Sequence, residues 1–266
     1  MANIKTDVKS EELIIPNPFH PFEIKMKEYQ EAEHYARFVV EPLERGFGIT
    51  LGNALRRVLL SALPGASVYA IEIEGVRHEF TSLKGVEEDV TAIILNLKDL
   101  VLKIDGPTNE VKRLEVDFKG PGVLKASDIE LQALVSVINK DLEIFDMMED
   151  ANILITAQID FNRGYVPSDV IQDMIDKDDD KNPGIIPVDA IFSPVTHVKH
   201  SIEPTRVGQR NDYDKLVLDV WTDGTISPED ALAEAAKIAK DHFSIFINFD
   251  ESMVSSSDEV DEEEER

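Results

Sequence analysis

Apolar residues recur at helical spacing in two segments of the chain, and each segment predicts a long helix. The first helix is expected to begin at an N-cap, Thr50, and to end before Pro64-Gly65. The second is expected to begin at Ser227, with Pro228 in its first position and Asp230 completing the capping pattern. The apolar side of the first helix consists of Leu51, Ala54, Leu55, Val58, Leu59 and Ala62.

Runs with strand character surround these helices. They lie at 35–41, 68–73, 100–104, 114–118, 153–161, 185–192 and 215–221. A shorter helix is predicted over 86–97, and the charged stretch 176–181 is predicted to be a loop. Strands grouped in this way, with few helices, indicate an α+β fold.

The second long helix has more apolar surface than one core can cover. At about 100° per residue, its apolar side chains spread over roughly 200° of the helix circumference. A core-facing stripe is narrower than that, so we expect one flank to pack on the chain's own sheet and the other on a second copy. A helix buried entirely within a monomer is the alternative. The apolar residues are Ala231, Leu232, Ala235, Ala236, Ile238, Ala239, Phe243, Ile245, Phe246 and Phe249.

Three residues of the first helix lie opposite its apolar stripe. Asn53, Arg57 and Leu60 form a small outward face on the helical wheel. An arginine fork beside a leucine suits a contact with a partner protein. Because single exposed leucines are also ordinary, an unremarkable solvated face is the other interpretation.

Charge and composition narrow the function classes. The chain of 266 residues has 42% hydrophobic residues, which suffices for one large domain or two ordinary ones. It contains no cysteine and no apolar segment of membrane length, so a reducing cytoplasm is expected. With 27 basic and 53 acidic residues the formal net charge is -26, which argues against direct DNA binding.

Both ends of the chain look irregular. Residues 1–24 contain three prolines and are expected to form an irregular arm. Residues 251–266 include eight acidic residues, one arginine and few apolar groups. Such a segment cannot bury enough apolar surface to offset its ordering entropy, so we expect a flexible linker or tail, or a merely solvated end.

Motifs for catalysis are weak. Gly46, Gly48 and Gly52 follow a strand and precede a helix, but the third glycine is one residue late for a dinucleotide-binding turn. His197 and His200 are three residues apart in a predicted strand, which points them to opposite faces and disfavours a metal pair. The acids at 178–180 could hold a cation weakly, although such runs usually form a solvated loop. No catalytic residue, metal site or cofactor site is predicted.

One long segment resembles a known family. Residues 41–65 read EPLERGFGITLGNALRRVLLSALPG and are similar, in order and without gaps, to the signature of the bacterial RNA polymerase α subunit. Further similar stretches lie at 73–80, 96–98, 163–167, 188–194 and 213–217. The resemblance covers roughly Phe38 to Phe249.

The resemblance implies an α+β dimerisation domain with a sheet and both long helices, interrupted by an inserted mainly-β domain. The dimerisation domain would comprise 25–65 and 186–250, the inserted domain 66–185, and the acidic linker 251–266. In this family one protomer contacts the β subunit and the other β′, while the catalytic magnesium site lies in β′. The family also continues into a carboxy-terminal domain that binds DNA and activators, which we expect to be absent from this chain.

Particular residues inherit roles from this resemblance. Arg57, Leu60 and Asn53 would contact the β subunit, and the family's contacts with β or β′ also fall on Lys98, Arg206, Gln209 and Asp212. The dimer interface would involve Leu51, Leu55, Leu59, Leu232, Ala239, Phe243 and Phe246. We thus expect a cytoplasmic homodimer that scaffolds polymerase assembly, associated with the nucleoid through the polymerase. The alternative is an unrelated acidic α+β dimer, for example an enzyme that binds an anion at the Gly46–Gly52 turn.

Overall fold

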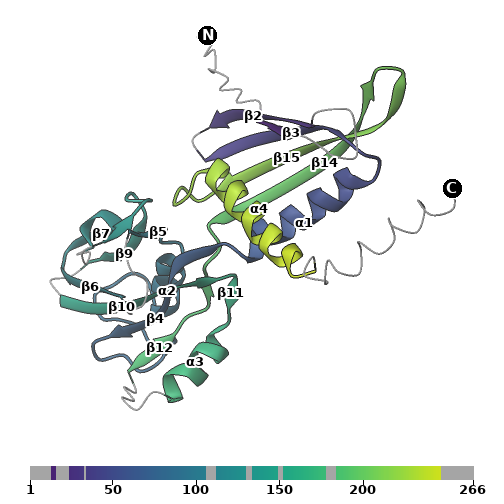
Figure 1. Cartoon of the computed structure of the whole chain (residues 1–266). Helices are drawn as coiled ribbons and strands as arrows, with labels where there is room; N and C mark the ends of the chain where they lie inside the picture. Colours follow the sequence, from purple (N-terminus) through teal and green to yellow (C-terminus); the bar gives the residue numbers. More distant parts are fainter. Residues whose placement is uncertain are drawn as a thin grey trace, which may run out of the picture.

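The structure is a computed structural model of the chain. It describes residues 13–15, 24–32, 34–105, 112–129, 134–148, 152–177 and 184–246. Within these residues, helices and antiparallel strands form two lobes (Figure 1). The mixed composition and the antiparallel sheets agree with the predicted α+β class.

A five-stranded sheet forms the first lobe, and its strands come from both ends of the described chain. Its order is β1-β2-β3-β15-β14, and every neighbouring pair is antiparallel. The strands are β1 (Leu13–Ile15), β2 (Ile24–Ala32), β3 (Tyr35–Leu43), β14 (Val195–Val207) and β15 (Arg210–Thr222). β14 and β15 continue past the sheet as a long hairpin (Figure 1).

Both long helices pack on one face of this sheet. They are α1 (Phe47–Ser61) and α4 (Pro228–Ser244). Their inward side chains meet the inward residues of β3, β14 and β15 in one apolar core, whose buried members are Ala36, Phe38, Leu59, Leu63, Val195, Val198, Leu218, Val220, Ala231, Leu232 and Ala235. The chain between the two helices forms the second lobe.

A six-stranded sheet forms the second lobe. Its order is β6-β10-β4-β5-β8, with β12 paired to β4. Its strands are β4 (Pro64–Ile73), β5 (Leu102–Ile104), β6 (Lys112–Lys119), β8 (Val135–Val137), β10 (Asn152–Arg163) and β12 (Ile185–Pro187). Two small sheets join it, β7 (Gly122–Lys125) with β9 (Glu143–Met147) and β11 (Tyr165–Val166) with β13 (Ala190–Ile191).

Short helices complete the second lobe. They are α2 (Val90–Lys98), the 3₁₀ turn η1 (Ala126–Asp128) and α3 (Ser168–Lys177). α2 buries Val90, Ile93 and Leu97 in the main core of this lobe. Ile171 of α3 packs instead with Ala190 and Phe192 in a separate small core.

The two lobes meet where the chain leaves the first helix and later returns to the sheet. A Cβ atom placed on Gly65 would lie 2.1 Å from the carbonyl oxygen of Phe192. Because no real Cβ comes so close to a backbone oxygen, only glycine fits where these two segments cross.

Several predicted boundaries were wrong. α1 begins at Phe47 with Gly46 as its N-cap, so Thr50 lies inside the helix and donates its hydroxyl to the carbonyl of Gly46. α2 begins at Val90 rather than at 86, because the Asp89 side chain accepts a hydrogen bond from the amide of Ala92 and caps the helix there.

Two predicted irregular segments contain regular structure. Residues 168–177 form α3, so Asp176 and Lys177 lie in a helix rather than in the predicted charged loop. The arm expected over 1–24 includes strand β1, which pairs with β2. The acids at 178–180 and the acidic segment 251–266 lie outside the described residues.

The predicted start of the second long helix is confirmed. The hydroxyl of Ser227 accepts a hydrogen bond from the amide of Asp230, and Pro228 occupies the first helical position. Within the described part of the chain, no helix combines the length and the apolar character needed to cross a membrane.

Candidate functional site

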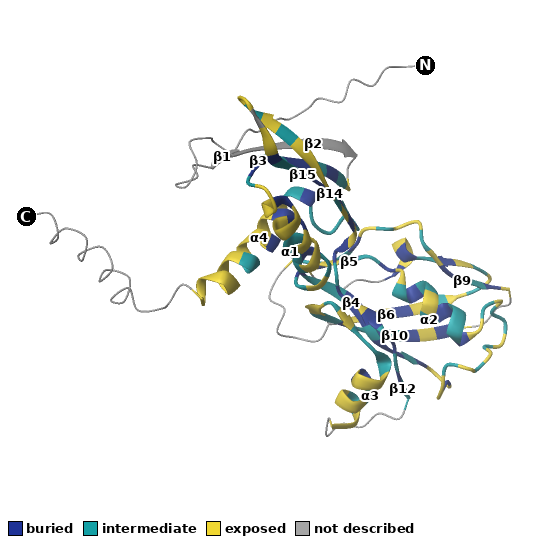
Figure 2. Ribbon diagram, turned by 90° about the vertical axis from the view of Figure 1, so that its right-hand side faces the viewer, coloured by how far each residue is buried: buried dark blue, intermediate teal, exposed yellow. Residues whose placement is uncertain are grey.

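The last turn of α4 and the residues just after it are exposed, since every position from 240 to 246 lies outside the core. Only Pro228, Ala231, Leu232 and Ala235 of this helix are buried. Phe243 in the last turn is 60% exposed and Phe246 just after it is 71% exposed. Figure 2 shows this part of α4 extending away from the sheet as a largely exposed helix. An exposed apolar surface therefore lies at the end of α4.

A second exposed apolar surface lies at the start of α1. Phe47 is 52% exposed, Leu51 is exposed one turn later on the same side, and Ile49 is exposed about 200° around the helix from Phe47. Sequence reasoning missed Phe47 and Ile49 because it placed the start of the helix at Thr50. The spacing of four residues between Phe47 and Leu51 could have revealed Phe47, since residues four apart share one side of a helix.

The residues predicted for the dimer interface differ in how far they are exposed. Leu51, Phe243 and Phe246 are exposed, whereas Leu55 and Ala239 are half-buried. Leu59 is fully buried, and Leu232 is also buried, in the core between the helices and the sheet. Because the chain's own core already covers these two leucines, a part in the dimer interface would be indirect, and it stays a prediction.

The predicted outward face of α1 is only partly outward. Asn53 and Arg57 are exposed, as the helical wheel indicates. Leu60 is half-buried and packs against the core of the first lobe, so its prediction as an outward residue was wrong. The adjacent Arg56 points elsewhere, because its Nε donates to the carbonyl of Val198 on β14 at 3.3 Å.

Lys98 lies at the end of α2 and binds within its own lobe. Its Nζ is 3.4 Å from Oδ2 of Asp189, whose Oδ1 accepts the Ser168 amide at 2.8 Å. The hydrogen bond from this amide is the main reason why the pKa of Asp189 lies below its usual value, and Lys98 adds to it. Lys98 therefore ties α2 to the start of α3.

The remaining predicted contact residues lie at the tip of the β14–β15 hairpin. Arg206, Gln209 and Asp212 are all exposed, and the tip turns at Gly208 with a φ of 61°. The Nε of Arg206 donates to the carbonyl of Gly208 at 2.8 Å. These residues are far in sequence from α1, but the hairpin that carries them runs beneath α1.

The glycine-rich turn before α1 already holds an anion from the chain itself. Oδ2 of Asp214 on β15 accepts hydrogen bonds from the amides of Gly46 at 2.8 Å and Gly48 at 3.2 Å. A phosphate would have to displace this carboxylate. The alternative of an enzyme with an anion site at this turn loses its structural basis.

The two histidines lie on opposite faces of β14, as expected. The ring of His197 packs on Trp221, with ring centroids 4.9 Å apart, whereas His200 lies beneath Gly52 of α1. Among the residues that the structure describes, no group of three His, Asp or Glu side chains could hold a metal ion.

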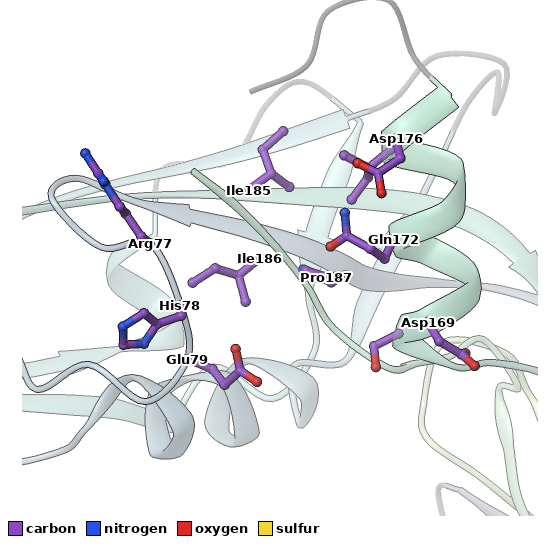
Figure 3. Close-up of a pocket in the computed structure, with 11 residues that line it drawn as sticks. Arg77, His78, Glu79, Asp169, Gln172, Asp176, Ile185, Ile186 and Pro187 are labelled. Carbon is purple, nitrogen blue, oxygen red and sulfur yellow. The ribbon is translucent and has the colours of Figure 1, made fainter. Parts of the chain in front are cut away.

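A groove lies in the second lobe, between the loop after β4 and α3. Its volume is about 500 Å³, and Ile186 and Pro187 of β12 lie between its two walls (Figure 3). His78 and Glu79 line one wall, and Asp169 and Gln172 line the other. None of the residues predicted for partner contacts lines this groove.

Comparisons with known proteins identify the family. The RNA polymerase Rpb3/RpoA insert domain matches residues 71–193, which coincide with most of the second lobe. A DNA-directed RNA polymerase subunit alpha of Geobacter metallireducens is 48% identical over 247 residues, covering 92% of this chain and 70% of the relative.

A second relative, from Leptospira biflexa, has the same name. It is 47% identical over 221 residues, which cover 83% of this chain and 66% of the relative. Both matches extend well beyond the insert domain, and so they include residues of the first lobe. The chain therefore belongs to the family of DNA-directed RNA polymerase α subunits.

Proposed function

We propose that this chain is a non-catalytic scaffold subunit of RNA polymerase, which homodimerises and nucleates assembly of the β and β′ subunits. The observation that carries the proposal is the pair of exposed apolar surfaces on the two helices that cover the five-stranded sheet. In this proposal the dimerisation domain comprises 25–65 and 186–250, and the inserted domain comprises 66–185.

The exposed area supports a stable contact. With about 200 Å² for a whole phenylalanine, Phe47, Phe243 and Phe246 together expose roughly 350 Å² per chain. This area is divided between two surfaces, one at the start of α1 and one at the end of α4, and Leu51 and Ile245 add to them. Apolar patches that gather several large exposed side chains often mark interaction sites on soluble proteins.

A twofold arrangement accounts for both surfaces at once. In a symmetric dimer the same two patches of each copy meet. If residue i of the first chain contacts residue j of the second, residue j of the first also contacts residue i of the second. The protruding end of α4 from each copy would cover the start of α1 of its partner. Leu51, Leu55, Ala239, Phe243 and Phe246 would then lie in or beside the interface, with Leu59 and Leu232 supporting it from the core.

The β subunit would bind the exposed face of α1 that contains Asn53 and Arg57. Leu60 would contribute from its half-buried position by fixing the side of the helix against the core. Lys98 and the hairpin residues Arg206, Gln209 and Asp212 would make further contacts with β or β′. No residue of the chain takes part in nucleotide chemistry in this proposal.

The test has two parts and uses purified chain with purified β and β′. Sedimentation velocity at micromolar concentration should show a dimer for the unchanged chain and a monomer for Phe243→Glu, because the dimer would bury an unpaired carboxylate. Phe80→Glu is the matched control, since Phe80 is 78% exposed but lies in the second lobe.

Size-exclusion chromatography then tests assembly. The unchanged chain should elute with β and β′ in one complex, and Phe243→Glu should not. A folded wild-type monomer at these concentrations would refute the dimer, and a dimer that never binds β or β′ would refute the scaffold role.

A further inference from the structure

The start of α1 differs from that of the other capped helices. α2 is capped by Asp89 and α4 by Ser227, both residues of their own segments. The N-cap of α1 is Gly46, which has no side chain to accept a hydrogen bond, and the first turn contains no acidic residue. The carboxylate that binds its first amides belongs to Asp214, which is 166 residues away from Gly48.

The contact between α1 and the hairpin is a seam of two glycines. A Cβ on Gly48 would lie 3.1 Å from Cβ and Oδ2 of Asp214, and one on Gly52 would lie 2.8 Å from the His200 ring. Ile202 and Leu216 complete the contact, next to Gly48 and Gly52 respectively. The helix therefore lies as close to the strands as its backbone allows.

The spacing of the seam follows from the geometry of the two elements. Four residues of helix rise about 6 Å, and two residues of strand advance about 6.6 Å. Gly52 and Gly48 accordingly meet alternate residues of both strands, His200 then Ile202 on β14 and Leu216 then Asp214 on β15. The amino-terminal end of α1 points toward the tip of the hairpin.

The two glycines hold the start of α1 close to the strands but offer no side chain that could lock into a hole. Farther along the helix, Leu59 in the core and the bond from Arg56 to Val198 hold α1 against the sheet. At the start of the helix the directional contacts are the two hydrogen bonds of Asp214, and a carboxylate there also interacts favourably with the helix dipole. A displacement of the first turn of α1 along the strands would break both bonds.

We propose that Asp214 is the positioning residue of α1 and couples the hairpin tip to the two surfaces on this helix. Asp214 is two residues from Asp212 at the tip and binds the turn next to Phe47, Ile49 and Leu51. A partner that displaces the hairpin therefore moves the start of α1, and a partner that binds α1 restrains the hairpin. The consequence for dimer and β binding rests on the proposed function, whereas the positioning itself does not.

Hydrogen exchange of the whole purified chain tests the positioning directly. Asp214→Ala should speed exchange of the amides at 46–51 about fivefold, the factor expected for losing a hydrogen bond. Asp214→Asn should remain within about twofold of the unchanged chain, because its amide oxygen can still accept both bonds. Glu203→Ala is the matched control, since it removes an exposed hairpin carboxylate whose partner is Lys215 rather than α1.

A second variant covers the case in which Asp214→Ala does not fold. Gly48→Ala retains the carboxylate but places a methyl group against it, so it should also speed exchange at 46–51. The first turn of α4, capped by its own Ser227, should be unaffected in every variant.

Binding of purified β separates the positioning from the proposed function. Asp214→Ala should weaken it about fivefold without loss of helical circular dichroism, and Asp214→Asn should restore it. Unchanged exchange at 46–51 in Asp214→Ala, or failure of Asp214→Asn to restore it, would overturn the positioning role. If exchange changes as expected but all variants bind β equally, the coupling alone is overturned. If the unchanged chain does not bind β at all, the scaffold function is refuted instead.

Discussion

Shortening Phe243 to alanine gives a quantitative test of the proposed dimer. Phe243 is 60% exposed, so a partner could cover about 120 Å² of it, of which alanine would retain a small part. At about 25 cal/mol per Å², the loss is about 2 kcal/mol for each copy. A symmetric dimer contains the substitution twice, so about 4 kcal/mol is lost and Kd rises roughly 1,000-fold.

Sedimentation equilibrium over a wide range of concentrations measures this change. The free energy of unfolding of the monomer should stay within about 0.5 kcal/mol, because the side chain is exposed in the isolated chain. Phe80→Ala, which shortens an exposed phenylalanine in the second lobe, should leave Kd unchanged.

Two outcomes would refute the reasoning. An unchanged dimer in Phe243→Ala would mean that the end of α4 is not in the interface. A large loss of monomer stability would mean that Phe243 packs within its own chain, contrary to its exposure.

Three further predictions concern single sites. Arg57→Ala should weaken β binding by roughly 5- to 150-fold in a titration, as for a central arginine anchor, and leave the dimer intact; Arg56→Ala, which removes a bond to β14 instead, should weaken β binding less. Gly52→Ala should lower the free energy of unfolding in urea by about 1–3 kcal/mol, because its Cβ would meet the His200 ring; Gly48→Ala, with contacts of 3.1 Å or more, should cost less. Because the folded-state pKa of Asp189 is lowered, its contribution to stability is present above the unfolded value of 3.8 and is lost as pH falls through the folded value. The stability difference between the unchanged chain and Asp189→Asn should therefore shrink in acid denaturation series below about pH 4, and an unchanged difference would contradict the Ser168 and Lys98 contacts.

Local signals made part of the fold predictable from sequence. The start of α4 depends on Ser227, Pro228 and Asp230, which are neighbours in the chain, and the structure confirms it. The start of α1 was not predictable in this way, because its capping carboxylate comes from a strand that is adjacent only after folding. Helix α3 was missed because its charged residues, Asp169, Asp173 and Asp176, dominate a short segment that buries only Ile171.

The candidate surfaces were also only partly predictable from the sequence. The helical wheel identified the apolar arc of α4, but periodicity does not say which flank the chain itself covers. Leu232 near the start of the helix is buried and Phe243 near its end is exposed, since the core of the first lobe reaches Ile238 but does not cover Phe243. On α1 the same uncertainty placed Leu60 outside, although it packs against the core.

The crossing of Gly65 and Phe192 has a consequence for how the chain tolerates change. The chain leaves the first lobe and returns to it at one point, so the long intervening segment closes its own ends through its own fold. The entropy cost of closing a loop grows only with the logarithm of its length. Because the inserted segment folds and holds its own ends together, it adds almost no such cost to the folding of the first lobe. Substitutions, insertions or deletions within the second lobe can therefore accumulate without altering the pairing of β3, β15 and β14. The condition is that Gly65 remains a glycine.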